Sequence, residues 1–149
     1  MKRLPKIFEP LPRDLRQGVP ESGRTVHVIE GDEEELVFLC DFLSFSGLRV
    51  SGSTDSERAL QFVERMRLDL LICNLATSEL GGDKLLERMR RASPATRIIL
   101  ISNWPKQPVV EHVRESSEID LLIGPFNAVS LLRAVERILG RERSGQFRA

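Results

Sequence analysis

The 149-residue sequence predicts a single α/β domain in which a parallel β-sheet lies between two layers of helices. Short apolar runs alternate with segments of helical periodicity from residue 24 to residue 140. Apolar residues make up 41% of the chain and charged residues 30%, which is the balance of a globular protein and not of a disordered one. Because strands alternate with helices, we expect right-handed crossovers between strands that run in the same direction.

The strands of this sheet are predicted at short runs rich in Val, Ile and Leu. The first run, residues 25–29, is β-rich and continuous, as in a strand that helices cover on both faces. The runs comprise residues 25–29, 48–51, 70–73, 97–101 and 119–123. His27 lies inside the first run, so we expect a core histidine with satisfied hydrogen bonds, and not a metal ligand or a base.

Helices are predicted between and after the strands. Asp32 and the three glutamates after it are typical of a helix start, since a capping carboxylate and an acidic first turn complement the unpaired N–H groups there. This helix is expected to run to about Ser46 and to end at Gly47. The other helices are expected at residues 54–67, 83–91, near 107–116 and at 128–140, where Gly140 ends the last one.

The inward faces of the first two helices follow from the spacing of their apolar residues. We expect burial of Leu36, Leu39, Cys40 and Leu43 in the first helix and of Ala59, Leu60, Phe62, Val63 and Met66 in the second. Cys40 and Cys73 lie in separate apolar segments, which predicts buried, reduced cysteines and not a disulfide or a metal pair. Two distant histidines are too few to complete a zinc site with them.

Both ends of the chain are predicted to lie outside the domain. Residues 1–23 hold four of the eight prolines and are expected to form a mobile or loosely docked arm, and residues 141–149 a frayed tail or the start of a linker. The 22 basic and 22 acidic residues cancel, so no net field attracts nucleic acid or a membrane. No apolar run approaches the ~20 residues of a membrane helix. We therefore expect a cytoplasmic protein.

A binding site is expected where the parallel strands end, because ligands in such folds lie outside the carboxyl ends of the strands. Residues 30–32, 74–82, 102–105 and 124–126 follow the first, third, fourth and fifth strands. The stretches VIEGDEEEL, DLLICNLATSELGGDKLLERMR, IILISN and IDLLIGPF, in this order, resemble the receiver domain of two-component response regulators over residues 24–140.

This resemblance implies a flavodoxin-like (βα)5 fold, a doubly wound sheet of five parallel strands in the order 2-1-3-4-5. It also implies a reaction, in which an aspartate after the third strand accepts a phosphoryl group from a histidine kinase. Two acidic residues after the first strand help that aspartate to bind Mg²⁺. A hydroxyl after the fourth strand and a lysine after the fifth contact the phosphoryl oxygens. The metal and the lysine offset the negative charge of the transferred group.

Most of these groups are missing when the resemblance is followed position by position. The phosphoacceptor position holds Asn74, a neutral amide that cannot form an acyl phosphate. The acidic pair becomes Glu30 and Gly31, and the lysine position holds Gly124. Because three functional groups are lost together, we interpret the domain as a degenerate receiver, a pseudo-receiver, and not as a working receiver with one blocked residue.

Other parts of the site are retained. Ser102 matches the hydroxyl position and Pro125 matches the proline that follows the lysine. Asp32 could contribute to a metal site, although it is equally well explained as a helix cap. Glu30, the amide oxygen of Asn74 and the carbonyl of Ala76 predict a weak Mg²⁺ site at most, and no other cofactor.

Trp104 is the only tryptophan and lies in the loop after the fourth strand, beside the predicted pocket. One interpretation is a partner anchor or a lid, because tryptophan is favoured at binding hot spots. The other is local packing on the nearby prolines, since tryptophan is often half-buried. The sequence leaves both interpretations open.

The function predicted from these residues is protein–protein interaction without phosphorylation and without enzymatic activity. The resemblance implies a contact face at residues 107–123 and 128–140, for a protein partner or a homodimer. An alternative is a regulator gated by a small ligand or a weakly bound metal in the emptied pocket. No output domain is visible, so a signal would leave through another chain or a domain beyond this sequence. The partner, the pathway, the oligomeric state and the role of the arm are not predicted.

Overall fold

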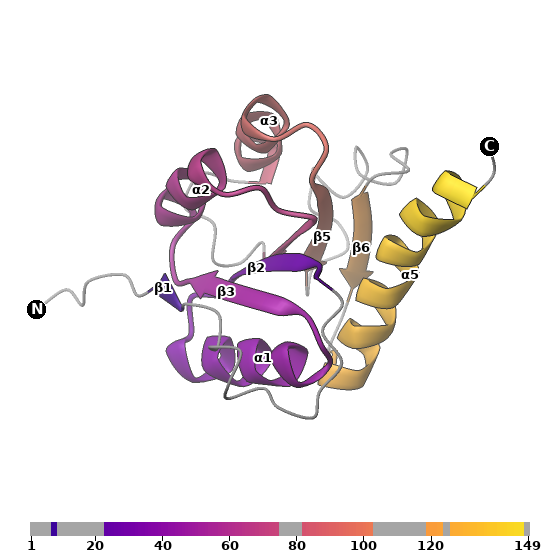
Figure 1. Ribbon diagram of the computed structural model, residues 1–149. Helices are drawn as coiled ribbons and strands as arrows, with labels where there is room; N and C mark the ends of the chain where they lie inside the picture. The colour runs from indigo at the N-terminus through magenta and orange to yellow at the C-terminus, as the bar shows by residue number, and fades with distance from the viewer. Residues whose placement is uncertain (1–6, 9–22, 75–81, 103–118, 124–125, 148–149) are drawn as a thin grey trace, which may run out of the picture.

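The computed structural model describes residues 7–8, 23–74, 82–102, 119–123 and 126–147. Their strands form one sheet in the order β1-β3-β2-β4-β5-β6 (Figure 1). The parallel strands are β2 (Thr25–Ile29), β3 (Arg49–Ser53), β4 (Leu70–Asn74), β5 (Arg97–Ser102) and β6 (Ile119–Ile123). Taken alone, these five strands have the order 2-1-3-4-5, which confirms the predicted flavodoxin-like fold.

Helices cover both faces of the sheet, as predicted. Helices α1 (Glu33–Phe45) and α5 (Ala128–Phe147) pack on one face, and α2 (Ser56–Arg65) and α3 (Gly82–Ala92) pack on the other. The helix expected near residues 107–116 lies outside the described residues. In the part of the chain that the structure describes, no helix combines the length and the apolar character needed to cross a membrane.

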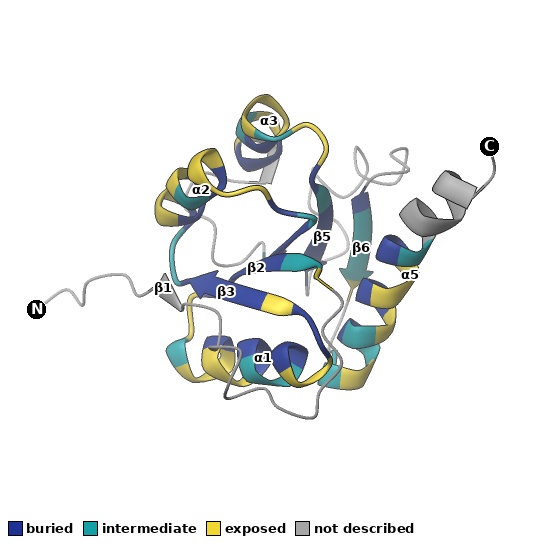
Figure 2. Cartoon of the chain, in the orientation of Figure 1, coloured by how far each residue is buried: buried dark blue, intermediate teal, exposed yellow. Residues whose placement is uncertain are grey.

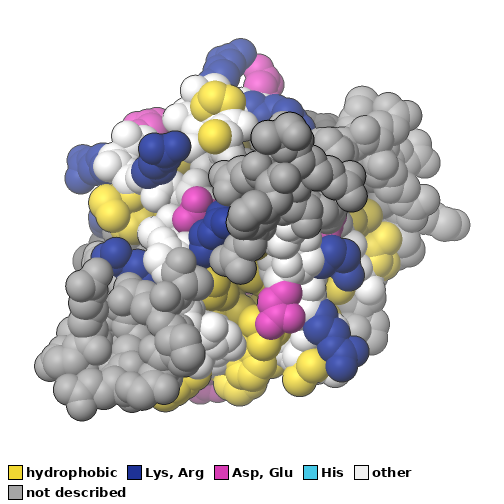
Figure 3. Space-filling model, turned by 45° about the vertical axis from the view of Figure 1, so that its right-hand side comes forward, with side chains coloured by type: hydrophobic (Ala, Val, Ile, Leu, Met, Phe, Trp, Pro, Cys, Tyr) yellow, Lys and Arg dark blue, Asp and Glu magenta, His cyan; other side chains and the backbone are white. Residues whose placement is uncertain are grey.

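Two apolar clusters form the core, one on each face of the sheet (Figure 2). Alternate residues of β2 point to opposite faces, so Val26 and Val28 join the cluster beneath α1 and α5, while Ile29 joins the one beneath α2 and α3. The expected inward residues of α1 are all buried. The surface seen in Figure 3 mixes basic with acidic side chains, in keeping with the balanced composition.

The two ends of α1 have the predicted caps. The Asp32 carboxylate accepts hydrogen bonds from the backbone N–H groups of Glu34 at 2.9 Å and Glu35 at 3.2 Å. At the other end Ser46 is the C-cap, and Gly47 follows with a φ of 93°, a value that costs glycine little because it has no Cβ. Sequence and local geometry therefore agree on the position of this helix.

A short strand that the sequence did not predict adds a sixth member to the sheet. In β1 (Ile7–Phe8), Ile7 pairs with Ser53 and Phe8 with Gly52, antiparallel to β3. The pairing satisfies backbone groups on the outer edge of β3, which would otherwise be open to other chains. The proline-rich arm thus contains at least one element that joins the domain's sheet.

Two predicted details of the helices are wrong. Met66 was expected to face inward, but α2 ends at Arg65 and Met66 adopts an extended backbone with 48% of its surface exposed. The last helix was expected to end at Gly140, but α5 continues to Phe147. A glycine costs a helix only about 1 kcal/mol, and Arg141, Glu142 and Arg143, which follow it, have high helix propensity.

Candidate functional site

The predicted site begins where β2 and β4 end side by side. In the parallel register Ile29 is paired with Cys73, so the next residues, Glu30 and Asn74, emerge together at the carboxyl edge of the sheet. The backbone N–H of Glu30 donates to the carbonyl of Ser53 at 3.1 Å, which ties this edge to β3 as well. The topology therefore brings together two of the residues that the sequence singled out.

Glu30 and Asn74 form a direct hydrogen bond. Nδ2 of Asn74 donates to Oε2 of Glu30 at 2.8 Å, and the backbone N–H of Asp32 donates to Oε1 of Glu30 at 3.3 Å. Only 6% of the surface of Glu30 is exposed, so its carboxylate depends on such donors for the hydrogen bonding that water would supply. The neutral amide of Asn74 thus partners a buried carboxylate without adding a second negative charge.

Asp32 and Gly31 complete the segment after β2. Both are exposed, and the Asp32 carboxylate is the N-cap of α1. The prediction that Asp32 caps the helix is confirmed, whereas nothing in its contacts tests a role in metal binding. Gly31 has no side chain to offer a ligand.

Strand β5, which lies beside β4 in the sheet, ends with a serine hydroxyl at the same edge. Ser102 is the last residue of β5, is 2% exposed and pairs with Ile123 of β6 in the parallel register. Gly124 follows Ile123 directly in the sequence, but Gly124, Pro125 and Trp104 lie outside the described residues. The predictions for these three residues remain predictions.

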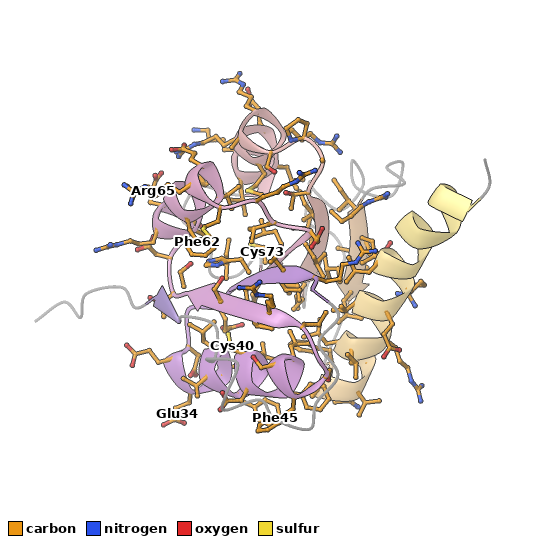
Figure 4. All side chains as sticks on the ribbon, viewed as in Figure 1. Glu34, Cys40, Phe45, Phe62, Arg65 and Cys73 are labelled. Carbon is orange, nitrogen blue, oxygen red and sulfur yellow. The ribbon has the colours of Figure 1, made fainter. Side chains whose placement is uncertain are left out.

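Cys40 and Cys73 are both buried, as the sequence predicted. Cys73, next to Asn74, is fully buried, and its burial, with a smaller contribution from the negative charge of Glu30, raises the pKa of the thiol to about 12 (Figure 4). Burial, with a smaller contribution from Asp41, likewise raises the pKa of Cys40 to about 12. Both cysteines are free thiols, and at neutral pH both remain protonated.

His27 is a buried core residue, as predicted. Its Nδ1 lies 2.8 Å from Oγ of Ser51 and its Nε2 lies 2.9 Å from Oγ of Ser53, while its ring stacks on Phe62 with 4.6 Å between centroids. Burial lowers the pKa of His27 to about 4, so the ring is neutral at pH 7. The two serines were not recognised from the sequence, because their partnership depends on the pairing of β2 with β3.

No group of three or more His, Cys, Asp or Glu side chains within the described residues is placed to hold a metal ion. The described polar side chains at this edge of the sheet are the Glu30 carboxylate, the Asn74 amide and the Ser102 hydroxyl, with the Asp32 carboxylate at the cap of α1. Glu30 and Asn74 are joined by a hydrogen bond, and the Asp32 carboxylate accepts from the backbone of α1.

Known proteins resemble this chain along most of its length. Residues 26–136 match the response regulator receiver domain. The transcriptional regulatory protein ZraR of Escherichia coli (strain K12) is 21% identical over 117 residues, 78% of this chain and 26% of ZraR. The Regulator of RpoS from the same strain is 25% identical over 114 residues, 76% of this chain and 34% of that protein. The chain thus spans about a quarter to a third of these relatives.

Solved structures show the same fold. The signal receiver domain of an HD domain-containing protein from Pseudomonas fluorescens Pf-5 superposes with a TM-score of 0.72 at 24% identity, covering 85% of this chain and 94% of that one. A CheY-like receiver domain protein from Methanospirillum hungatei JF-1 gives a TM-score of 0.73 at 18% identity, covering 83% and 99%. With the match over residues 26–136, the strand order and the placement of the site, the chain belongs to the response regulator receiver domain family.

Proposed function

We propose that this receiver domain does not accept a phosphoryl group at its usual site and transmits its signal by binding another protein. The observation that supports this most strongly is the 2.8 Å hydrogen bond from Nδ2 of Asn74 to Oε2 of Glu30. In the family pattern an aspartate and an acidic residue meet at this point, and two neighbouring carboxylates need a cation between them. Here a neutral amide donates to a single carboxylate, and this pair needs no cation.

The residue at the phosphoacceptor position argues against phosphotransfer. Receivers resemble one another in using an aspartate there, whose carboxylate attacks phosphorus. A carboxamide has no such nucleophilic oxygen, and its nitrogen lone pair is delocalised into the carbonyl. Asn74 closes β4 at this position, so the chain offers no carboxylate at the end of that strand.

The metal requirement argues in the same direction. A Mg²⁺ ion bound at Oε2 of Glu30 would have to displace the Asn74 N–H. Gly31 cannot replace the lost ligand, and Gly124 supplies no cation for a phosphoryl oxygen. In the receiver domain of PA1611 from Pseudomonas aeruginosa, by contrast, magnesium is coordinated in the active site cleft. We propose that this domain has no comparable affinity for Mg²⁺.

The output is proposed to be a protein contact and not an enzymatic reaction. A domain without a phosphorylation switch needs another input that favours one of its conformations, and a bound partner supplies one. We place this contact on the face that includes β6 and α5. There the structure describes exposed apolar side chains at Ile123, which is 37% exposed, and Val129, which is 52% exposed.

Incubation with Mg²⁺ and acetyl phosphate, followed by intact-mass measurement, tests the proposal. The wild-type protein should not gain the mass of a phosphoryl group. A variant that combines Asn74→Asp, Gly31→Asp and Gly124→Lys restores the implied acceptor, metal ligand and cation, and should gain it. Phosphorylation of the wild type at this site would overturn the proposal. If the triple variant gains no phosphoryl group, residues 74, 31 and 124 do not occupy the acceptor, metal-ligand and lysine positions of the family.

A further inference from the structure

A cavity of about 240 Å³ opens at the amino edge of the sheet, opposite the edge that carries Glu30 and Asn74. It lies between the start of β2, the C-terminal end of α1 and one side of α5. Helices α1 and α5 are steeply inclined to each other in Figure 1, so they do not pack against each other along their whole lengths. The cavity is therefore separate from the edge at which the receiver family places its chemistry.

The floor of the cavity is aliphatic. Leu48, Leu132 and Leu139 line it, and Gly140 leaves one part of its wall without a side chain. A Cβ added at Gly140 would meet no atom within 4 Å, so there is open space beside this residue. A cavity of roughly 150 Å³ is enough to bind benzene, whereas drug-sized ligands occupy roughly 300–1,000 Å³. The cavity thus matches a molecule of the size of an amino acid, and it is too small for a nucleotide.

The polar side chains of the cavity carry charges of both signs. The Arg24 side chain is 17% exposed and lies 4.0 Å from Asp69, whose carboxylate also accepts from the backbone N–H of Thr25 at 2.9 Å. A guanidinium has five N–H donors, so Arg24 can bind a ligand carboxylate while it stays beside Asp69. Glu136, an exposed residue of α5, brings a carboxylate to the same cavity. A purely anionic ligand would therefore meet Arg24 but be repelled by Glu136.

The end of α1 also favours a positively charged group. Ser46 lines the cavity, and its hydroxyl donates to the carbonyl of Phe42 at 3.1 Å, so its oxygen keeps lone pairs for another donor. The C-terminal end of a helix carries partial negative charge, and the last turn of α1 has no basic residue to offset it. An ammonium group can therefore be held by Glu136, Ser46 and the end of α1 together.

We propose that this cavity binds a small zwitterion with a branched aliphatic side chain, of the class of the amino acid leucine. The aliphatic group occupies the floor, Arg24 binds the carboxylate, and Glu136 and Ser46 bind the ammonium group. The site stands apart from the proposed function, because it uses no residue of the edge that carries Asn74. It places a ligand on α5, the helix that also carries the exposed Val129 of the proposed partner contact.

Isothermal titration calorimetry of the full chain with L-leucine, without Mg²⁺ or a phosphoryl donor, tests the inference. Leucine should bind with a dissociation constant of about 1 mM or lower. Three analogues are matched controls, since glycine lacks the side chain, 4-methylpentanoate the ammonium group and 3-methylbutylamine the carboxylate. Each should bind at least about tenfold more weakly than leucine. No binding of leucine, or equal binding of an analogue, would overturn the inference, and neither result bears on phosphorylation at residue 74.

Variants of the chain test where the ligand binds. Gly140→Leu fills the cavity from a position with open space, so it should abolish binding and keep or raise the melting temperature. Glu136→Gln should reduce the preference for leucine over 4-methylpentanoate about tenfold, because it removes the partner of the ammonium group. Glu64→Gln, which changes an exposed glutamate of α2 on the opposite face of the sheet, is the control and should leave this preference unchanged. Leucine binding that survives Gly140→Leu, or a preference that survives Glu136→Gln, would overturn the inference.

Discussion

The side-chain amide of Asn74 donates a 2.8 Å hydrogen bond to the carboxylate of Glu30, across the neighbouring ends of β4 and β2. In the receiver family this edge of the sheet is where the phosphorylation chemistry is expected. Here the amide of Asn74 and the backbone N–H of Asp32 donate to the buried carboxylate of Glu30.

Asn74→Asp should destabilise the fold by about 1–3 kcal/mol at neutral pH, because it replaces the donor to Glu30 with a second carboxylate. Urea unfolding measures the change, and added Mg²⁺ should recover part of it by neutralising the pair. Asn127→Asp is a matched control. Asn127 is exposed and caps the start of α5 through Oδ1, and an aspartate caps equally well there. If both variants lost the same stability, the contact with Glu30 would have no special importance.

The buried His27 should make the fold sensitive to acid. Burial lowers its folded-state pKa from 6.5 to about 4, so the unfolded chain binds more protons between these values. The contribution of the neutral His27 to the free energy of unfolding is therefore complete above pH 6.5. It decreases by about 3 kcal/mol as the pH falls towards 4. Chemical unfolding at a series of pH values should show this loss. His27→Gln should flatten that part of the profile.

Gly52 should be essential for the packing of α1 on the sheet. A Cβ at Gly52 would lie 2.7 Å from Cδ1 of Leu36, 2.9 Å from Sγ of Cys40 and 3.1 Å from the carbonyl oxygen of Val28. Because the last of these is backbone, Gly52→Ala should cost about 1–3 kcal/mol in the free energy of unfolding. Gly140→Ala has open space around its Cβ and should instead stabilise α5 by up to about 1 kcal/mol. A harmless Gly52→Ala would contradict the close approach of α1.

Asp32 should act as a helix cap and not as a metal ligand. Asp32→Asn retains an oxygen acceptor for the N–H groups of Glu34 and Glu35, so the melting temperature should stay close to that of the wild type. Asp32→Ala removes the acceptor and should cost about 1 kcal/mol. Thermal unfolding with and without Mg²⁺ separates the roles. A Mg²⁺-dependent stabilisation that Asp32→Asn removes would point to a metal ligand.

The sequence predicted the parallel strands closely, because each is a short run rich in Val, Ile or Leu. The third strand, for example, was expected at residues 70–73 and is found at Leu70–Asn74. The strand β1 was not predicted, because two residues have no periodicity and the strand depends on backbone pairing with β3. Met66 was misplaced because apolar spacing continued beyond the point where the helix ends.

Within the site, the residue types could be predicted and their contacts could not. Asn74, Glu30 and Ser102 were identified by position, and the parallel register places their strand ends on one edge. The hydrogen bond between Asn74 and Glu30 joins residues that are 44 apart in the chain, and it depends on side-chain directions that no local pattern specifies.

The most direct test of the central claim is the NMR signal of the Asn74 side-chain NH₂ group during a Mg²⁺ titration. Its loss in Asn74→Ala assigns the signal, and Glu30→Gln should shift it by weakening the acceptor. If the amide and Glu30 satisfy each other, the Asn74 signal should not move as Mg²⁺ is added. A saturable shift at sub-millimolar Mg²⁺, absent from Glu30→Gln, would show that the cation displaces the amide and would contradict the account.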